Sequence, residues 1–202
     1  MIIAFTGAGV SEESGIETFQ EKPWIRDCLT RSYAQRHPEK YRAVMRDFVA
    51  SVSGKEPNDA HIALAEYDIP VLTMNVDTLH EQAGTKTIVK MHGRLPTAEE
   101  LPYCDKLYNT PVLYEDPAPA YQEAYEMLDY MTHGDVLLVI GASHYTTVST
   151  MMRTCAMMRG ATVVEIQDSA STKVREYLEA NKDKIKSFEE RKRNFDALDW
   201  RE

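Results

Sequence analysis

The residues best suited to chemistry in this chain are a glycine turn, a histidine and an amide–carboxylate pair. The turn, Gly7-Ala8-Gly9, directly follows the apolar run 2–5. Because glycine has no Cβ, such a turn lets backbone N–H groups approach a phosphate closely, and a dinucleotide is its natural ligand. Glu12 stands where the usual dinucleotide fingerprint has its third glycine, so a plain turn remains the alternative.

The histidine is His92, which follows the apolar run 87–91 and precedes Gly93. An imidazole with a pKa near neutrality can take a proton from a sugar hydroxyl, so His92 is a candidate general base. The glycine is expected to leave space above the ring. The alternative is a histidine satisfied by hydrogen bonds at the end of a strand.

The amide and the carboxylate belong to Asn75 and Asp77, which follow the apolar run 69–73. Residues two apart share a face in extended chain, and this pair suits ribose hydroxyls and a carboxamide. Helix capping is the alternative, with Asp77 or Thr78 beginning the helix that follows; for Asp77 both roles are compatible.

Short buried strands must position these residues. Apolar runs alternate with helical patterns, which indicates βαβ units and a parallel sheet. Each polar cluster follows a predicted strand, where an open parallel sheet has its ligand crevice. We therefore expect an α/β fold: one Rossmann-like doubly wound parallel sheet over residues 1–202, with helices on both faces. Helices are expected near 38–53, 57–67, 117–132 and 146–159, with one or two surface helices in the tail 172–202.

Composition limits the class of protein. The 202 residues suit a single domain, and the net charge of −9 argues against a nucleic-acid partner. No apolar run approaches the roughly 20 residues of a membrane span, and no signal peptide is visible. Cys28, Cys104 and Cys155 are far apart and odd in number, which disfavours a disulfide framework and favours the cytoplasm.

Several motifs together resemble a known family. They are GAGVSEESGIETF, PNDAHIALAE, TMNVDTLHEQAG, MHG and DVLLVIGAS, and they cover most of residues 1–168. The chain resembles the sirtuins, which are NAD-dependent protein deacylases. The resemblance implies NAD as cofactor, an acyl-lysine protein or peptide as partner, a cofactor-binding loop at 15–27 and a small module at 94–110.

The resemblance also implies roles for individual residues. His92 is the general base, Asn75 orders water and ribose, and Asp77 binds the nicotinamide amide. Pyrophosphate contacts fall to Gly7, Ala8, Gly9 and Ser11, and on the other side of the crevice to Gly141, Ala142 and Ser143. Alternatively, Ser143 caps the helix that follows it.

The resemblance further implies adenosine contacts at Gln167 and Asp168. Phe19 covers the nicotinamide pocket, or else packs on the core as a loop residue. His61 and His80 are expected to be structural.

The chain departs from the family at several points. A structural zinc needs four ligands, and only Cys104 lies between His92 and Pro111, so a zinc-free, reduced small domain is expected. The family's substrate-pairing strand corresponds to Val112, Leu113 and Tyr114, with its Phe-Gly lost. Met74 and Gln20 replace a glutamine and an arginine that contact the cofactor.

Three functions follow from these observations. The first is NAD-dependent lysine deacylation, in which nicotinamide is released and the acyl group passes to ADP-ribose. The second is an NAD hydrolase or ADP-ribosyltransferase, which the missing module and the altered substrate strand favour. The third is a non-catalytic sensor of NAD or ADP-ribose, which the changes at Met74 and Gln20 leave open.

Overall fold

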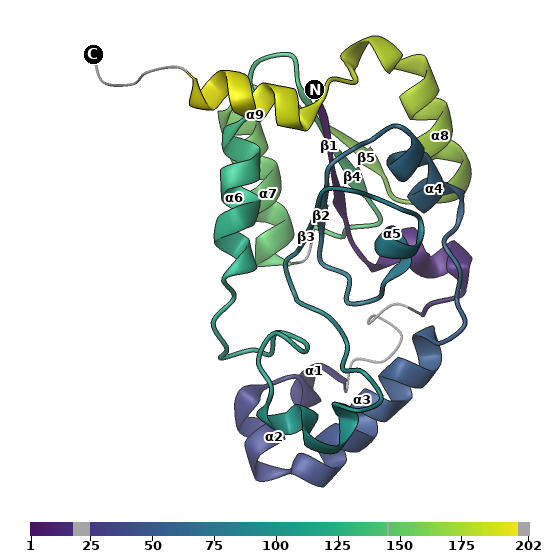
Figure 1. Ribbon diagram of the computed structural model, residues 1–202, viewed down its shortest axis with the longest axis vertical. Coiled ribbons are helices and arrows are strands. Elements are labelled where there is room, and N and C mark those ends of the chain that lie inside the picture. Colours follow the sequence, from purple (N-terminus) through teal and green to yellow (C-terminus); the bar gives the residue numbers. More distant parts are fainter. Residues whose placement is uncertain (18–24, 145, 198–202) are drawn as a thin grey trace.

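A parallel sheet is the centre of the molecule. The structure, a computed structural model, describes residues 1–17, 25–144 and 146–197. Within them the sheet has five strands in the order β3-β2-β1-β4-β5, all parallel. They are β1 (Ile2–Thr6), β2 (Val71–Thr73), β3 (Ile88–Lys90), β4 (Val136–Ile140) and β5 (Thr162–Ile166). The chain builds outward from β1 to β3, then crosses over to β4 and β5 (Figure 1), which confirms the predicted doubly wound fold.

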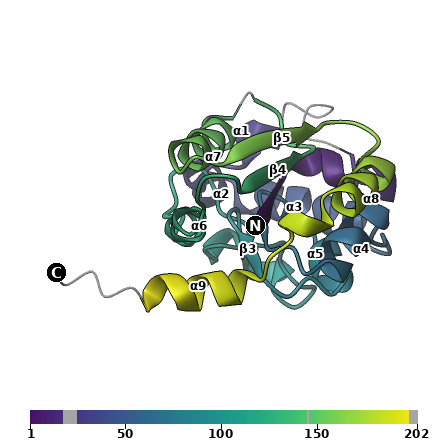
Figure 2. The ribbon, with the colours of Figure 1, turned by 90° about the horizontal axis from the view of Figure 1, so that it is seen from above.

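Both faces of the sheet are covered by helices, because alternate residues of each strand point to opposite sides. On one side, Ile3 and Phe5 pack with α6 (Ala120–Asp129), α7 (Thr147–Met158) and the start of α9 (Phe188–Asp196). On the other side, Ile2 and Ala4 pack with α4 (Asp59–Glu66), α8 (Ala170–Ala180) and the 3₁₀ helix η1 (Ala8–Ser14). Figures 1 and 2 show these two sets of helices on opposite sides of the strands.

The tail differs from the expected surface helices. Helix α8 begins at Ala170, and its Val174 and Leu178 are fully buried in the core between α8 and α4. The short 3₁₀ helix η3 (Lys182–Lys184) leads to α9, whose Phe188 is buried. The C-terminal segment therefore completes both faces of the sheet. Among the described residues, no helix is both long and apolar enough to cross a membrane.

Helix boundaries follow their capping residues. Thr30, Asn58, Thr146 and Ser187 accept hydrogen bonds from the first turns of α2 (Arg31–Arg36), α4, α7 and α9. The cap of α7 is Thr146, so the alternative in which Ser143 caps this helix is wrong. The expected helix at 117–132 is shorter, spanning Ala120–Asp129.

A helical lobe lies below the sheet in Figure 1. It consists of α1 (Ile25–Cys28), α2, α3 (Pro38–Val52) and the 3₁₀ helix η2 (Leu101–Lys106). Tyr41, Met45, Cys104 and Leu113 meet in its apolar cluster. Segment 94–110, the expected reduced module, is thus packed on helices that lie some sixty positions earlier in the chain. An ion pair between Arg42 and Asp105, at 2.6 Å, joins the same two segments.

One arginine links the two parts of the lobe. Arg31 is 7% exposed and forms a two-pronged ion pair with Asp116, with distances of 2.7 and 2.6 Å. Its remaining N–H groups donate to the carbonyls of Asp105 and Leu107, both at 2.7 Å. The guanidinium also lies 4.4 Å from the ring centre of Tyr108. These bonds hold segment 105–116 against the start of α2.

Replacing this arginine should destabilise the lobe strongly. In Arg31→Met the carboxylate of Asp116, whose side chain is 1% exposed, loses its counter-ion, and two carbonyls lose their donor. Breaking a buried pair from one side costs about 3–5 kcal/mol. We expect a loss of that size in the free energy of unfolding, measured by urea denaturation.

The matched control is Arg36→Met on the same helix. Arg36 is exposed and bonds only to the Ser32 carbonyl among the described residues, so its loss should cost less than about 0.5 kcal/mol. Equal effects of the two substitutions would contradict the role given to Arg31.

Candidate active site

A cavity of about 720 Å³ opens at the carboxyl ends of the strands, between the sheet and the helical lobe. The sheet side contributes Gly7–Gly9, Asn75, His92, Gly141–Ser143 and Gln167. The lobe side contributes Leu29, Met45, Phe48 and the segment 111–116. Residues from every predicted cluster therefore line one cavity at the point where the strand order reverses, as expected for a nucleotide crevice.

Two glycine turns cross at the centre of this cavity. A Cβ on Gly7 would lie 2.7 Å from the carbonyl oxygen of Gly141, and one on Gly9 would lie 2.7 Å from the Gly141 Cα. Gly141 itself has φ +57°, which a side chain would strain. The N–H groups of Gly7 and Gly9 donate to Ile140 and Gly141 carbonyls at 3.0 Å. These glycines thus serve the close approach of the turns, and their own N–H groups are already bonded.

Behind the first turn, Ser11 joins the amide and the carboxylate. Asn75 Nδ2 donates to Ser11 Oγ at 3.2 Å, and Ser11 Oγ donates to Asp77 Oδ2 at 3.0 Å. All three side chains are buried, but only Asn75 lines the cavity. Because its NH₂ group is bonded to Ser11, Asn75 offers its carbonyl oxygen Oδ1 to a ligand.

Asp77 lies deeper than the sequence suggested. Its Oδ1 accepts from Leu79 N at 3.0 Å, so it begins α5 (Leu79–Gln82), as the capping alternative had it. Burial raises the pKa of Asp77, while the hydrogen bonds from Leu79 and Ser11 lower it in part. Both oxygens are thus engaged with the protein, and contact with nicotinamide stays a prediction.

His92 sits between a carbonyl and a phenol. Its Nδ1 lies 3.0 Å from the Met74 carbonyl, and its Nε2 lies 3.0 Å from Tyr121 Oη. A carbonyl can only accept, so Nδ1 carries the proton and Nε2 is the basic nitrogen. Burial lowers the pKa of His92, although the bond to Met74 raises it in part. At neutral pH the ring is therefore uncharged and able to take a proton at Nε2.

Tyr121 was not predicted from the sequence. It lies in the first turn of α6, lines the cavity, and has its pKa raised by burial. Its hydroxyl donates to Nε2 of His92, the position a substrate hydroxyl would take. An aromatic residue in an amphipathic helix gives no local signal that it reaches a base from a different strand.

The glycine after His92 does not leave open space, contrary to expectation. A Cβ on Gly93, which has φ +70°, would overlap the carbonyl oxygen of Asn109. The His92 carbonyl also accepts from Val112 N at 2.9 Å. Gly93 is required because the chain returning from the lobe passes directly against it.

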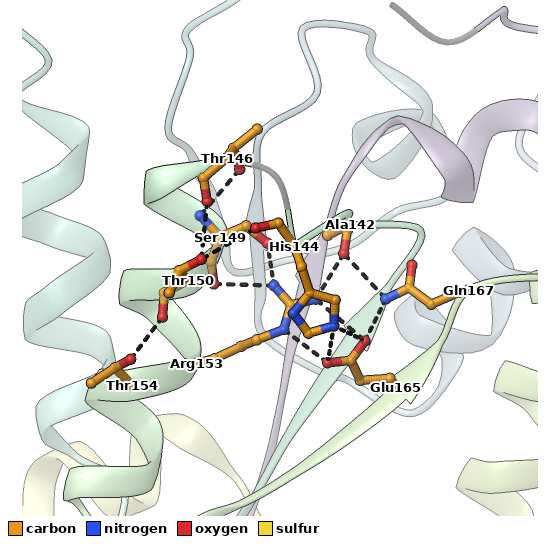
Figure 3. A network of polar contacts seen from close by, with 9 residues as sticks. All are labelled: Ala142, His144, Thr146, Ser149, Thr150, Arg153, Thr154, Glu165 and Gln167. Carbon is orange, nitrogen blue, oxygen red and sulfur yellow. Dashed lines mark hydrogen bonds and ion pairs between the residues drawn. The ribbon is translucent and has the colours of Figure 1, made fainter. Parts of the chain in front are cut away.

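The adenosine end of the predicted site is built around Glu165. Gln167 lines the cavity, and its Nε2 donates to Glu165 Oε2 at 2.7 Å and to the Ala142 carbonyl at 3.1 Å (Figure 3). Arg153 from α7 donates to the same carboxylate and the same carbonyl. Asp168 is exposed, pairs with Lys173 and does not line the cavity.

The predicted substrate strand has most of its hydrogen bonds occupied. Val112, Leu113 and Tyr114 all line the cavity. Their N–H groups donate to His92, Asp116 and Leu29, and the Tyr114 carbonyl accepts from Arg31 N at 3.0 Å. Leu113 is buried in the lobe, whereas Tyr114 is 63% exposed. Little backbone is therefore available for pairing with an added peptide.

Two positions discussed from the sequence, Phe19 and Gln20, lie outside the described residues. Met74 is half-buried, lines the cavity and contributes its carbonyl to His92. Within residues 1–17, 25–144 and 146–197, no three His, Cys, Asp or Glu side chains come together as a metal site. Cys104, the one cysteine between His92 and Pro111, is buried in the apolar cluster of the lobe.

His61 and His80 are buried together, as structural residues. Their ring centres are 4.7 Å apart, and His80 Nε2 lies 3.0 Å from Thr6 Oγ1. Among the described residues, neither nitrogen of His61 has a hydrogen-bonding partner. Burial lowers the pKa of His61 to about 4. Both rings are therefore neutral core groups behind the site.

Fold and cavity define an open α/β nucleotide-binding domain, and comparison with known proteins identifies its family. The Sir2 family model matches residues 7–177. An NAD-dependent protein deacylase of Pyrococcus furiosus is 31% identical over 88% of this chain and 86% of its own length. A Bacillus cereus NAD-dependent protein deacetylase is 34% identical over 70% of this chain and 71% of its own. The chain belongs to the Sir2 family, the sirtuins.

A solved structure supports the same assignment. A Sir2 homologue in complex with NAD superimposes with a TM-score of 0.78, covering 92% of this chain and 90% of its own, at 25% identity. The resemblance that the motifs indicated is thus confirmed, together with the Rossmann-like fold.

The buried His61 predicts how stability changes with pH. In the unfolded chain this histidine binds a proton near pH 6.5, but in the folded protein only near pH 4. Between these values the unfolded state binds more protons, so the free energy of unfolding falls as the pH falls.

The substitution His61→Leu should remove on the order of 3 kcal/mol of this loss of stability between pH 7 and 4. Urea denaturation at several pH values measures it, with the exposed His133→Leu as control. An unchanged pH slope in His61→Leu would contradict the prediction.

Proposed function

We propose that this sirtuin is an NAD-dependent protein-lysine deacylase that breaks the nicotinamide–ribose bond and transfers the acyl group of a modified lysine to ADP-ribose. The observation that carries the proposal is the placement of one neutral, basic imidazole nitrogen, His92 Nε2, in the same cavity as the crossed glycine turns. A base and a glycine turn at the switch point of the sheet, on one wall of the cavity, fit a reaction at the ribose of a dinucleotide.

The residues present fit NAD. A side chain at Gly7 or Gly9 would collide with the second turn, so the close crossing that forms this wall of the cavity depends on these glycines. When bound, NAD supplies an electrophilic ribose carbon and hydroxyl groups. Asn75 Oδ1 accepts a hydrogen bond from a hydroxyl or from water, because its amide nitrogen is held by Ser11.

His92 moves the proton in this reaction. Its Nδ1–H is held by the Met74 carbonyl, which orients the ring and leaves Nε2 basic. Nε2 accepts the proton of a ribose hydroxyl, which frees that oxygen to attack the acyl carbon. Tyr121, which donates to Nε2, either moves aside or passes the proton through its own oxygen.

A second function is favoured by one observation. The N–H groups of Val112, Leu113 and Tyr114 are all bonded within the protein. A peptide that binds as an added strand needs free backbone groups on its neighbour. If no peptide binds here, water or another nucleophile attacks instead, and the enzyme is an NAD hydrolase or an ADP-ribosyltransferase.

Nicotinamide release separates these functions. We expect the protein to release nicotinamide from NAD only when an acyl-lysine peptide is present, and to form O-acyl-ADP-ribose and free lysine in equal amounts. Mass spectrometry with and without a panel of acyl-lysine peptides measures this. Equal release without peptide would replace deacylation by hydrolysis or ADP-ribosyl transfer. No release under any condition would favour a nucleotide sensor.

His92→Ala tests the base. It should abolish turnover, since general-base catalysis contributes roughly 10²- to 10⁴-fold and His92 is the only histidine among the described residues that line the cavity. NAD affinity should change little, because the glycine turns and Asn75 are untouched. Turnover and isothermal titration with NAD are compared with His133→Ala, an exposed histidine far along the chain. Full activity in His92→Ala would contradict the role of His92 as the general base.

A further inference from the structure

The basic nitrogen of His92 already has a partner. Tyr121 Oη lies 3.0 Å from His92 Nε2, and the two rings are tilted by 49° with their centres 6.0 Å apart. Because the Nδ1–H of His92 is donated to the Met74 carbonyl, Nε2 carries a lone pair and the phenol is the donor. A ligand hydroxyl therefore reaches Nε2 directly only if Tyr121 leaves; otherwise it meets the phenol oxygen.

Contacts outside this pair hold both side chains in place. Tyr121 lies in the first turn of α6, where its N–H donates to the Ala118 carbonyl at 3.1 Å. Its half-buried ring packs against the apolar core in which α6 also buries Ala124 and Leu128. On the other side, the Met74 carbonyl fixes the imidazole. Moving the phenol aside would give up this packing and leave Nε2 without its donor, so the contacts favour a phenol that stays.

A phenol that stays can pass a proton on. Its oxygen donates one hydrogen to Nε2 and keeps two lone pairs that can accept. Tyr121 lines the cavity, so a ligand hydroxyl can donate to that oxygen. Burial raises the pKa of Tyr121, which disfavours a free phenolate. The phenol therefore gives up its own proton to His92 only as it receives another from the ligand.

We propose that Tyr121 is a further catalytic residue of this site, a relay that carries the proton of a ribose hydroxyl to His92. The O–H bond of the ribose breaks as a new O–H bond forms at Tyr121 Oη, while the original phenol proton moves to Nε2. Tyr121 is neutral before and after. The positive charge resides on the imidazole, where the Met74 carbonyl stabilises it, and the electron pair stays on the ribose oxygen that attacks the acyl carbon. This relay rests on the proposed deacylase function.

The variant Tyr121→Phe tests the relay, because it keeps the packed ring and removes only the oxygen. With NAD and an acyl-lysine peptide, kcat should fall at least about tenfold, since the oxygen that joins the ribose hydroxyl to Nε2 is gone. The KM for NAD should change less than kcat. If Tyr121 instead moved aside in the reaction, its loss would leave turnover unchanged or make it faster.

Tyr125→Phe is the matched control on the same helix. Tyr125 lies one turn further along α6 and is also half-buried, and its hydroxyl donates to Met151 Sδ at 3.6 Å. It does not line the cavity. The same chemical change at this position should leave kcat and the KM for NAD as they are in the wild type.

An NMR titration of His92 tests the hydrogen bond without any turnover. A donor to Nε2 favours the neutral imidazole, so Tyr121→Phe should raise the pKa of His92, by about one pH unit. Tyr125→Phe should leave it where it is. The ionisable side chains that act on Tyr121 are Tyr114 and Tyr125, and a phenol carries no charge in the pH range of a histidine titration.

The outcomes separate the relay from the proposed function. Unchanged or faster turnover in Tyr121→Phe would overturn the relay and leave deacylation standing, whatever the titration shows. A loss of turnover with no change in the His92 pKa, or an equal loss in Tyr125→Phe, would show a merely structural effect and overturn it as well. Wild-type protein that never cleaves NAD would overturn the proposed function, and the relay with it.

Discussion

The close crossing of two glycine turns is the constraint on which the site depends. β1 and β4 are neighbours in the sheet, and the turns after them meet where only hydrogen atoms fit between the backbones. The two bonds from Gly7 and Gly9 to residues 140 and 141 lock this crossing. The chain runs from β1 to β2 on one side of this crossing and from β4 to β5 on the other. Ser11 and Asn75 therefore lie on one side of the crossing, and Gln167 lies on the opposite side. The cavity is therefore a consequence of strand order combined with three missing side chains.

The helical lobe provides the opposite wall, and charge rather than a large core holds it. The apolar cluster of the lobe is small, and Arg31 ties its two sequence segments together through Asp116 and two carbonyls. The returning segment then meets the sheet at Gly93, where it packs on Asn109, and at the bond from Val112 N to the His92 carbonyl. The position of His92 thus depends on contacts with a lobe whose first helices lie far from it in the sequence.

Much of this arrangement could be predicted from local patterns. The strands, the glycine turns and the polar residues after each strand are encoded in short segments, and the observed strands end within about two residues of the apolar runs. The family resemblance added roles for His92 and Asn75, and the structure brings both to one cavity. Residues that follow a strand in a parallel sheet have their place dictated by that strand, so spacing along the chain is enough to find them.

Other features depend on contacts between distant segments and carry no local signal. Tyr121 reaches His92 across 29 positions, and Arg31 reaches Asp116 across 85. The depth of Asp77 depends on Ser11, which comes from a different turn and separates the carboxylate from the cavity. Gly93 was expected to leave open space above His92, because the sequence does not show that the backbone of Asn109 packs against this glycine. A pattern in the chain indicates which element a residue belongs to, but not which distant element packs on it.

A common rule connects the two ends of the cavity. At one end, Ser11 holds the NH₂ of Asn75; at the other, Glu165 and the Ala142 carbonyl hold the NH₂ of Gln167. An amide has one donor side and one acceptor side, so binding the donor side from behind leaves the acceptor side for the ligand. His92 follows the same rule, since its Nδ1–H is bonded to the Met74 carbonyl and its Nε2 is left as an acceptor, which Tyr121 Oη occupies. Each half of the site therefore presents an acceptor, and a ligand with a sugar hydroxyl near each end satisfies all three. The groups bonded to each amide and to the imidazole from within the protein thus fix which of their atoms a ligand in the cavity would meet.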